Sequence, residues 1–188
     1  MDLINIHARA LAEFGRRVAE LRPEQRHDPT PCTDWDVDAL VSHLVNEQLW
    51  VPPMLAGETV EQVGDRFDGD LLGDQPFEAW QRAAGAAHEA FAEPGALARP
   101  VHLSYGDRPA ADYLLEMVSD LVIHAWDLAR GLGVDDRLDP ELVELVYSRT
   151  EPQVSGLAAS GLFAPPVAVS DDADRQTRLL ALYGRAVG

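Results

Sequence analysis

The sequence predicts an all-α protein built as a bundle of helices joined by irregular loops. Apolar residues recur at steps of three or four along several segments, which is the spacing of one helix face, and the period-two alternation of strands is nearly absent. Prolines and glycines gather between these segments. With 188 residues, 46% of them hydrophobic, the chain can bury a sizeable core, and we expect one domain over residues 1–188.

The first helix is expected over residues 3–21, where the apolar residues keep helical spacing. The proline-rich stretch 23–34 then indicates a loop. A second helix is expected to begin near Val37. The side chain of Thr33 or Asp36 would serve as its N-cap, because both lie just before the next run of spaced apolar residues.

Two prolines, Pro52 and Pro53, are expected to end or kink this second helix, because a proline ring removes a helical hydrogen bond. Residues 57–76 are rich in glycine and aspartate, and we assign them to a loop with one helical turn near Val60. The third helix is predicted over residues 76–91. Its first residue is a proline, a position at which the missing N–H costs nothing.

The connection over residues 93–109 is expected to be irregular, with a short extended piece at 101–105. The clearest helix of the chain follows over residues 109–130, because it starts at a proline and stops at glycines. Two further helices are predicted over residues 139–155 and 175–186.

The chain is strongly acidic, with 32 Asp and Glu against 15 Lys and Arg and a formal net charge of -17. Such a charge repels polyanions, so we expect neither nucleic acid nor a membrane surface as a partner. No stretch approaches the ~18 apolar residues of a membrane span, and the N-terminus lacks a signal-peptide core. We expect a cytoplasmic protein.

The single cysteine, Cys32, excludes an intrachain disulfide and a cysteine-based metal cluster, and it fits a reducing compartment. Its thiol could be reactive. No basic cluster nearby favours a lowered pKa, however, so a small packed loop residue is the preferred interpretation.

On the longest predicted helix, Asp120 and His124 lie four residues apart and therefore face the same side, where they could hold one cation. The alternative is a solvated acidic face on which Asp120 and Asp127 flank an exposed histidine, and spacing alone favours this alternative. Tyr113 and Met117 lie on the same side and weaken this alternative, because such side chains are unusual on a purely solvated face. The expected core face is formed by Leu114, Val118, Leu121, Val122, Ala125 and Ala129.

His43, on the second helix, is the other informative histidine. A ligand role requires its helix to face that of Asp120 and His124, as in bundles that build metal sites from facing helices. A core histidine would give the same pattern. Asp127 could orient a ligand through a hydrogen bond, or balance a charge near the helix end. The other histidines are interpreted as surface or locally hydrogen-bonded residues: His7, His27, His88 and His102.

Three separated motifs point to a known family. Residues 30–37 read Thr-Pro-Cys-Thr-Asp-Trp-Asp-Val and lead to His43, and residues 120–131 read Asp-Leu-Val-Ile-His-Ala-Trp-Asp-Leu-Ala-Arg-Gly. With the ending over residues 163–185, they resemble the mycothiol-dependent maleylpyruvate isomerase N-terminal family of the DinB-like superfamily, in its short metal-binding members. The resemblance spans essentially the whole chain.

This resemblance implies a DinB-like four-helix bundle with extra short helices and long loops, and it places the family's metal ligands on His43, Asp120 and His124. Zinc is the first expectation for the divalent metal, and nickel or iron come next. Three protein ligands leave an open position for water or substrate. The isomerase usually has glutamate where this chain has Asp120, so a degenerate site without metal is a further alternative.

Family members of known activity use a low-molecular-weight thiol, mycothiol in this branch, for isomerisation or for transfer to an electrophile. The resemblance therefore implies a metal-dependent enzyme with mycothiol as cosubstrate. The isomerase has an additional C-terminal domain for which this chain leaves no room, so we expect thiol transfer or an unassigned reaction over maleylpyruvate isomerisation. The alternative is a non-catalytic metal- or small-molecule-binding bundle that serves sequestration or resistance. A homodimer through an outer helix face is compatible with both.

Overall fold

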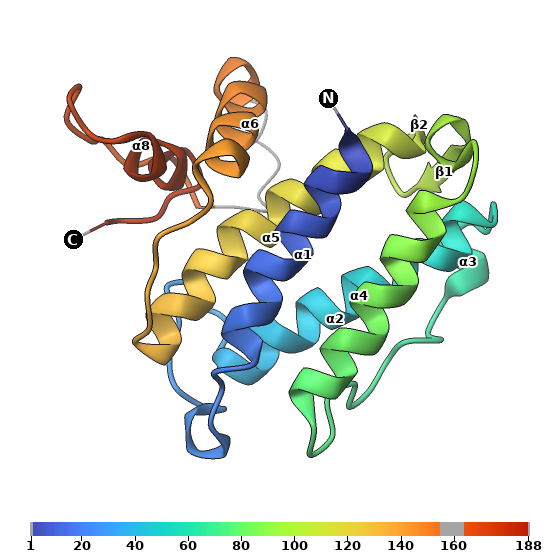
Figure 1. The fold of residues 1–188 in the computed structure, drawn as a ribbon, viewed down its shortest axis with the longest axis horizontal. Coiled ribbons are helices and arrows are strands. Elements are labelled where there is room, and N and C mark those ends of the chain that lie inside the picture. Colours follow the sequence, from blue (N-terminus) through green and yellow to red (C-terminus); the bar gives the residue numbers. More distant parts are fainter. Residues whose placement is uncertain (1, 155–163, 188) are drawn as a thin grey trace.

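Four long helices form the body of the protein in the computed structural model, which describes residues 2–154 and 164–187. They are α1 (Leu3–Val18), α2 (Val37–Leu55), α4 (Pro76–Ala92) and α5 (Ala110–Leu132). Helix α1 packs along α5 and α2 along α4, and the contacts of α1 with α4 and of α2 with α5 close the bundle (Figure 1). The predicted all-α class is confirmed.

Short elements connect and cover this bundle. They are η1 (Pro23–Gln25), α3 (Val60–Val63), η2 (Ala96–Ala98), β1 (Pro100–Leu103), β2 (Gly106–Pro109), α6 (Pro140–Thr150), η3 (Glu151–Gln153) and α8 (Arg175–Leu182). The predicted extended piece is one strand of an antiparallel hairpin, in which Val101 lies opposite Arg108. Among the described residues, no helix combines the length and the apolar character needed to cross a membrane.

The N-cap of α2 is Asp36, whose carboxylate accepts a hydrogen bond from the backbone N–H of Ala39 at 2.9 Å. The expectation that Pro52 and Pro53 end or kink this helix is wrong as to its end, because α2 continues to Leu55. Burial of Pro53 and Leu55 in the core stabilises the last turn despite the lost hydrogen bonds.

Helix α5 is the central element, since α1, α2 and α6 all pack against it. The predicted core face of this helix is confirmed as buried, and from Leu121 to Ala129 the opposite face is buried as well. At its end, Gly133 adopts the left-handed conformation (φ 68°) of a helix C-cap, as the glycines in the sequence predicted.

The C-terminal part packs back onto this framework. Helix α6 ends at Thr150, where η3 follows directly, and α8 ends at Leu182, earlier than predicted; the two helices contact each other (Figure 1). The predicted end of the former near Ser155 and the start of the third motif, residue 163, lie outside the described residues. After α8 the chain turns at Gly184, whose φ is 78°.

Candidate metal centre

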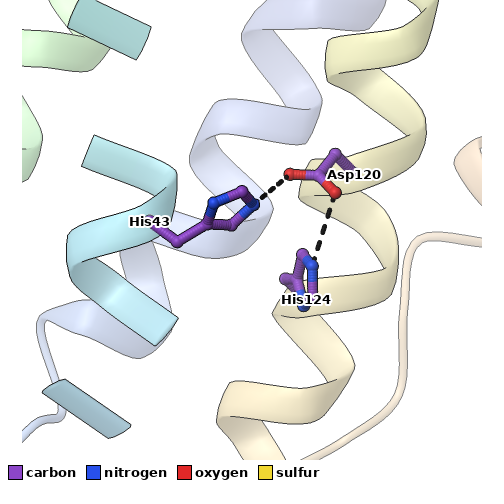
Figure 2. A group of neighbouring side chains, drawn as sticks. All are labelled: His43, Asp120 and His124. Carbon is purple, nitrogen blue, oxygen red and sulfur yellow. Dashed lines mark hydrogen bonds and ion pairs between the residues drawn. The ribbon is translucent and has the colours of Figure 1, made fainter. Parts of the chain in front are cut away.

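The three predicted ligands lie together between α2 and α5. Nε2 of His43 is 3.2 Å from Oδ2 of Asp120, and Nε2 of His124 is 3.3 Å from Oδ1 of the same carboxylate. Figure 2 shows the Asp120 carboxylate lying between the two imidazoles, one reaching across from α2 and the other one turn further along α5. One ligand atom from each of the three residues falls within 4.8 Å of the others.

Burial differs among the three side chains in a way that suits a site with one open side. His124 is 3% exposed, whereas His43 and Asp120 are 27% and 21% exposed. Because His124 is buried, and Tyr113, Met117 and Asp127 are buried with it, the alternative of a solvated acidic face is wrong.

Electrostatic attraction favours the contacts among these side chains. Burial by itself disfavours the charged carboxylate of Asp120, but the two imidazoles outweigh it and hold the pKa of Asp120 well below its ordinary value. Burial likewise disfavours a charged ring at His124, and here Asp120 and Asp127 outweigh it and raise the pKa of His124 to about 9. The ring therefore bridges two carboxylates at neutral pH.

Asp127 holds the far side of that ring. Its Oδ2 atom lies 2.9 Å from Nδ1 of His124, and the Asp127 side chain is fully buried. The same carboxylate accepts two hydrogen bonds from the guanidinium of Arg185, from Nε at 3.1 Å and from Nη2 at 2.6 Å. Of the two roles left open for Asp127, the structure supports the orienting one.

Two more side chains shape the surroundings of the imidazoles. The indole of Trp35 lies against both rings, with centroid distances of 4.5 Å to His43 and 5.5 Å to His124. Glu47 follows His43 by one turn of α2, and burial together with the negative charge of Asp120 raises the pKa of Glu47 to about 7. A carboxyl group of this kind can exchange a proton near neutral pH.

The donor set and its spacing fit a divalent metal ion. Two imidazole nitrogens and a carboxylate oxygen are ligands that zinc and related ions accept. Donors bound to tetrahedral zinc at about 2.0–2.1 Å lie roughly 3.4 Å from each other. In the structure the two imidazoles contact different oxygens of Asp120, at 3.2 and 3.3 Å, and one ligand atom from each residue lies within 4.8 Å of the others, so small side-chain rotations suffice to aim all three at one ion. The shorter reach of aspartate therefore does not keep the three groups apart.

The remaining histidines and Cys32 stand outside this group. His27 and His102 make local contacts with Asp36 and Asp107, at 2.9 and 2.8 Å, as predicted. The same interpretation is wrong for His7, which is fully buried. Burial raises the pKa of Cys32, against the opposing charge of Arg185, so the thiol stays protonated and the packed-residue interpretation holds.

Sequence reasoning missed the supporting residues of the site. Trp35 belongs to the first motif, but nothing in its spacing indicates contact with His43 and His124. Glu47 was visible only as a helix-face neighbour of His43. Arg185 is separated from Asp127 by 58 residues, and only a conserved-looking pattern across relatives, not a single sequence, could have linked them.

The chain is similar to one family of proteins and to two uncharacterized bacterial proteins. The model of the mycothiol maleylpyruvate isomerase N-terminal domain family matches residues 7–129, which include all three candidate ligands. Two uncharacterized proteins of Mycobacterium tuberculosis, from strains CDC 1551 and H37Rv, are each 36% identical over 146 residues, covering 76% of this chain and 74% of the relative. No solved structure matches the chain significantly.

Proposed function

The chain belongs to the mycothiol maleylpyruvate isomerase N-terminal domain family, and from this premise we propose that it is a metal-dependent enzyme that uses a low-molecular-weight thiol. The thiol is mycothiol, and the reaction is S-transfer to a small electrophile or its isomerisation. His43, Asp120 and His124 would hold the ion, with zinc as first choice and nickel or iron next. The single observation that supports this proposal best is the convergence of two imidazoles and a carboxylate at metal-ligand spacing.

The chemistry that such an ion supplies is a lowered pKa of a coordinated thiol, so that thiolate is present at neutral pH. The protein's own groups have separate tasks. Asp127 holds Nδ1 of His124 and leaves Nε2 for the ion. Trp35 covers the two rings and limits access of water. Glu47, one turn from His43, is the carboxylate we expect to receive the proton of the incoming thiol.

The partly exposed side of the site, at His43 and Asp120, is the direction from which we expect thiol and electrophile to enter. The acidity of the chain agrees with a small-molecule substrate and opposes nucleic acid.

The test combines metal analysis with a thiol assay. Freshly purified protein is analysed for bound metal, and protein loaded with zinc, nickel or iron is incubated with mycothiol and a panel of alkyl halides, epoxides and unsaturated acids. We expect loss of free thiol and an adduct or isomer detected by mass spectrometry. His43→Ala should abolish both metal retention and turnover, whereas His27→Ala, which alters an exposed histidine, should change neither.

No thiol consumption and no isomerisation with any of the three metals would contradict the enzyme proposal. Tight binding of mycothiol or metal without turnover would instead support the alternative of a sequestering bundle.

A further inference from the structure

We propose that Arg185, near the C-terminus, is a positioning residue of the metal centre: through Asp127 it fixes the ring of His124 and so sets the affinity for the ion. The inference rests on the proposed function, because it presumes that His124 is a metal ligand. It goes further by assigning part of the centre to a segment after α8, beyond the residues 7–129 that the family model matches.

The contact between Arg185 and Asp127 has the geometry of a strong ion pair. Two guanidinium nitrogens donate to the two carboxylate oxygens, at 3.1 and 2.6 Å, in a bidentate arrangement. The Arg185 side chain is 6% exposed and that of Asp127 is fully buried, so solvent screens the pair little.

The backbone around Arg185 directs this side chain inward. Its N–H donates to the carbonyl oxygen of Leu180 at 3.0 Å, and its Nη1 atom donates to the carbonyl oxygen of Tyr183 at 2.8 Å. Gly184 makes the turn with a φ of 78°, and a Cβ atom there would lie 2.6 Å from the Cβ of Ala164. The turn thus depends on glycine, and it orients the guanidinium toward the centre of the molecule.

Asp127 passes this constraint to the metal ligand. Its Oδ2 atom, which Arg185 contacts, is also the atom 2.9 Å from Nδ1 of His124. A carboxylate that accepts a hydrogen bond from Nδ1–H fixes both the tautomer and the ring orientation, and it leaves Nε2 directed at the ion. Because Arg185 holds both oxygens of Asp127, the carboxylate cannot rotate away from the ring.

A purely structural role for Arg185, as an anchor of the C-terminal segment, predicts a different outcome. An anchor affects the stability of the fold, but it leaves the affinity and geometry of a bound metal unchanged. A positioning residue changes both, since loss of a partner that orients a metal-ligating histidine typically weakens metal affinity by roughly 10- to 100-fold.

The experiment uses the full chain and four variants: Arg185→Gln, Arg185→Lys, Asp127→Asn and, as a matched control, Arg130→Gln. Arg130 also pairs with an aspartate, Asp136, but on the exposed surface. Zinc affinity is measured by competition with a chromophoric chelator, the visible spectrum of the Co²⁺-loaded protein reports ligand geometry, and the melting temperature is measured without metal.

We expect Arg185→Gln and Asp127→Asn to weaken zinc binding by about 10- to 100-fold and to alter the Co²⁺ spectrum. Arg185→Lys keeps the charge that Asp127 requires and should fold, but it lacks the planar fork, so its zinc affinity should fall between those of wild type and Arg185→Gln. Arg130→Gln should bind as wild type does.

Wild-type zinc affinity and an unchanged Co²⁺ spectrum in Arg185→Lys and Arg185→Gln, even with a lowered melting temperature, would overturn the positioning role and leave the metal centre intact. If Arg185→Gln does not fold, the lysine variant decides the question. Wild-type protein that binds neither zinc nor Co²⁺ would overturn the metal centre itself, and the role of Arg185 with it.

Discussion

His7 makes the stability of the protein depend on pH in a way that can be isolated. Its side chain on α1 is fully buried against Phe91 and near His88, and a contact with Gln48 only partly offsets the cost of charging the ring. Burial, with a smaller contribution from His88, lowers the pKa of His7 from 6.5 to about 4. The folded protein therefore keeps this ring neutral down to a pH at which the unfolded chain has already protonated it.

The sign and size of this pH dependence of stability follow from the linkage between proton binding and folding. Because the unfolded state binds more protons between pH 6.5 and 4, the free energy of unfolding falls as the pH is lowered through this range. With pKa values of 6.5 unfolded and about 4 folded, lowering the pH from 7 to 5 should remove about 2 kcal/mol of stability through His7 alone.

The assay is urea unfolding of wild type and His7→Leu at a series of pH values from 7.5 to 4.5. All other titrating groups are present in both proteins, so the difference between the two unfolding free energies isolates His7. We expect this difference to shift by about 2 kcal/mol in favour of the leucine variant between pH 7 and pH 5. Parallel pH profiles for wild type and His7→Leu would refute the reasoning.

Three further predictions concern other parts of the molecule. Zinc binding must displace the proton that His124, with a pKa of about 9, holds before zinc is added. The apparent zinc affinity should therefore fall about tenfold per pH unit below pH 9. Calorimetry in buffers of different ionisation enthalpy measures the released proton, and a pH-independent affinity would contradict this prediction. Gly15→Ala places a Cβ atom 2.5 Å from the indole Nε1 of Trp80. The substitution should lower the free energy of unfolding by about 1–3 kcal/mol, despite the better helix propensity of alanine, and should shift the tryptophan fluorescence. A stabilised variant would show that the indole moves freely. Asp36→Ala removes the side-chain cap at the backbone N–H of Ala39. Urea unfolding should show a free energy of unfolding lower by about 1 kcal/mol. An unchanged unfolding midpoint would mean that water replaces the cap.

The helices themselves were predictable from the chain, because their signals are local. The spacing of apolar residues, the proline at the start of α4 and the glycine after α5 act within a few residues of each other, and the structure has helices at these places. The relation between Asp120 and His124 was predictable for the same reason, since residues four apart on any helix lie one turn above the other. The resemblance of the motifs to the isomerase family, and not helix spacing, identified His43 as the third candidate ligand.

What surrounds a helix is not local, and here the tertiary structure decided. Apolar spacing gives one preferred face of α5 but does not state how many neighbours cover the helix. Because α1, α2 and α6 all pack against it, His124 and Asp127 are buried, although Asp112 and Glu116 nearer its start remain exposed. His7 is buried because α4 packs against α1 and brings Phe91 and His88 against its ring. The contact of Arg185 with Asp127 joins segments 58 residues apart, and a pairing of that kind is set by packing of the whole chain, not by any pattern along it.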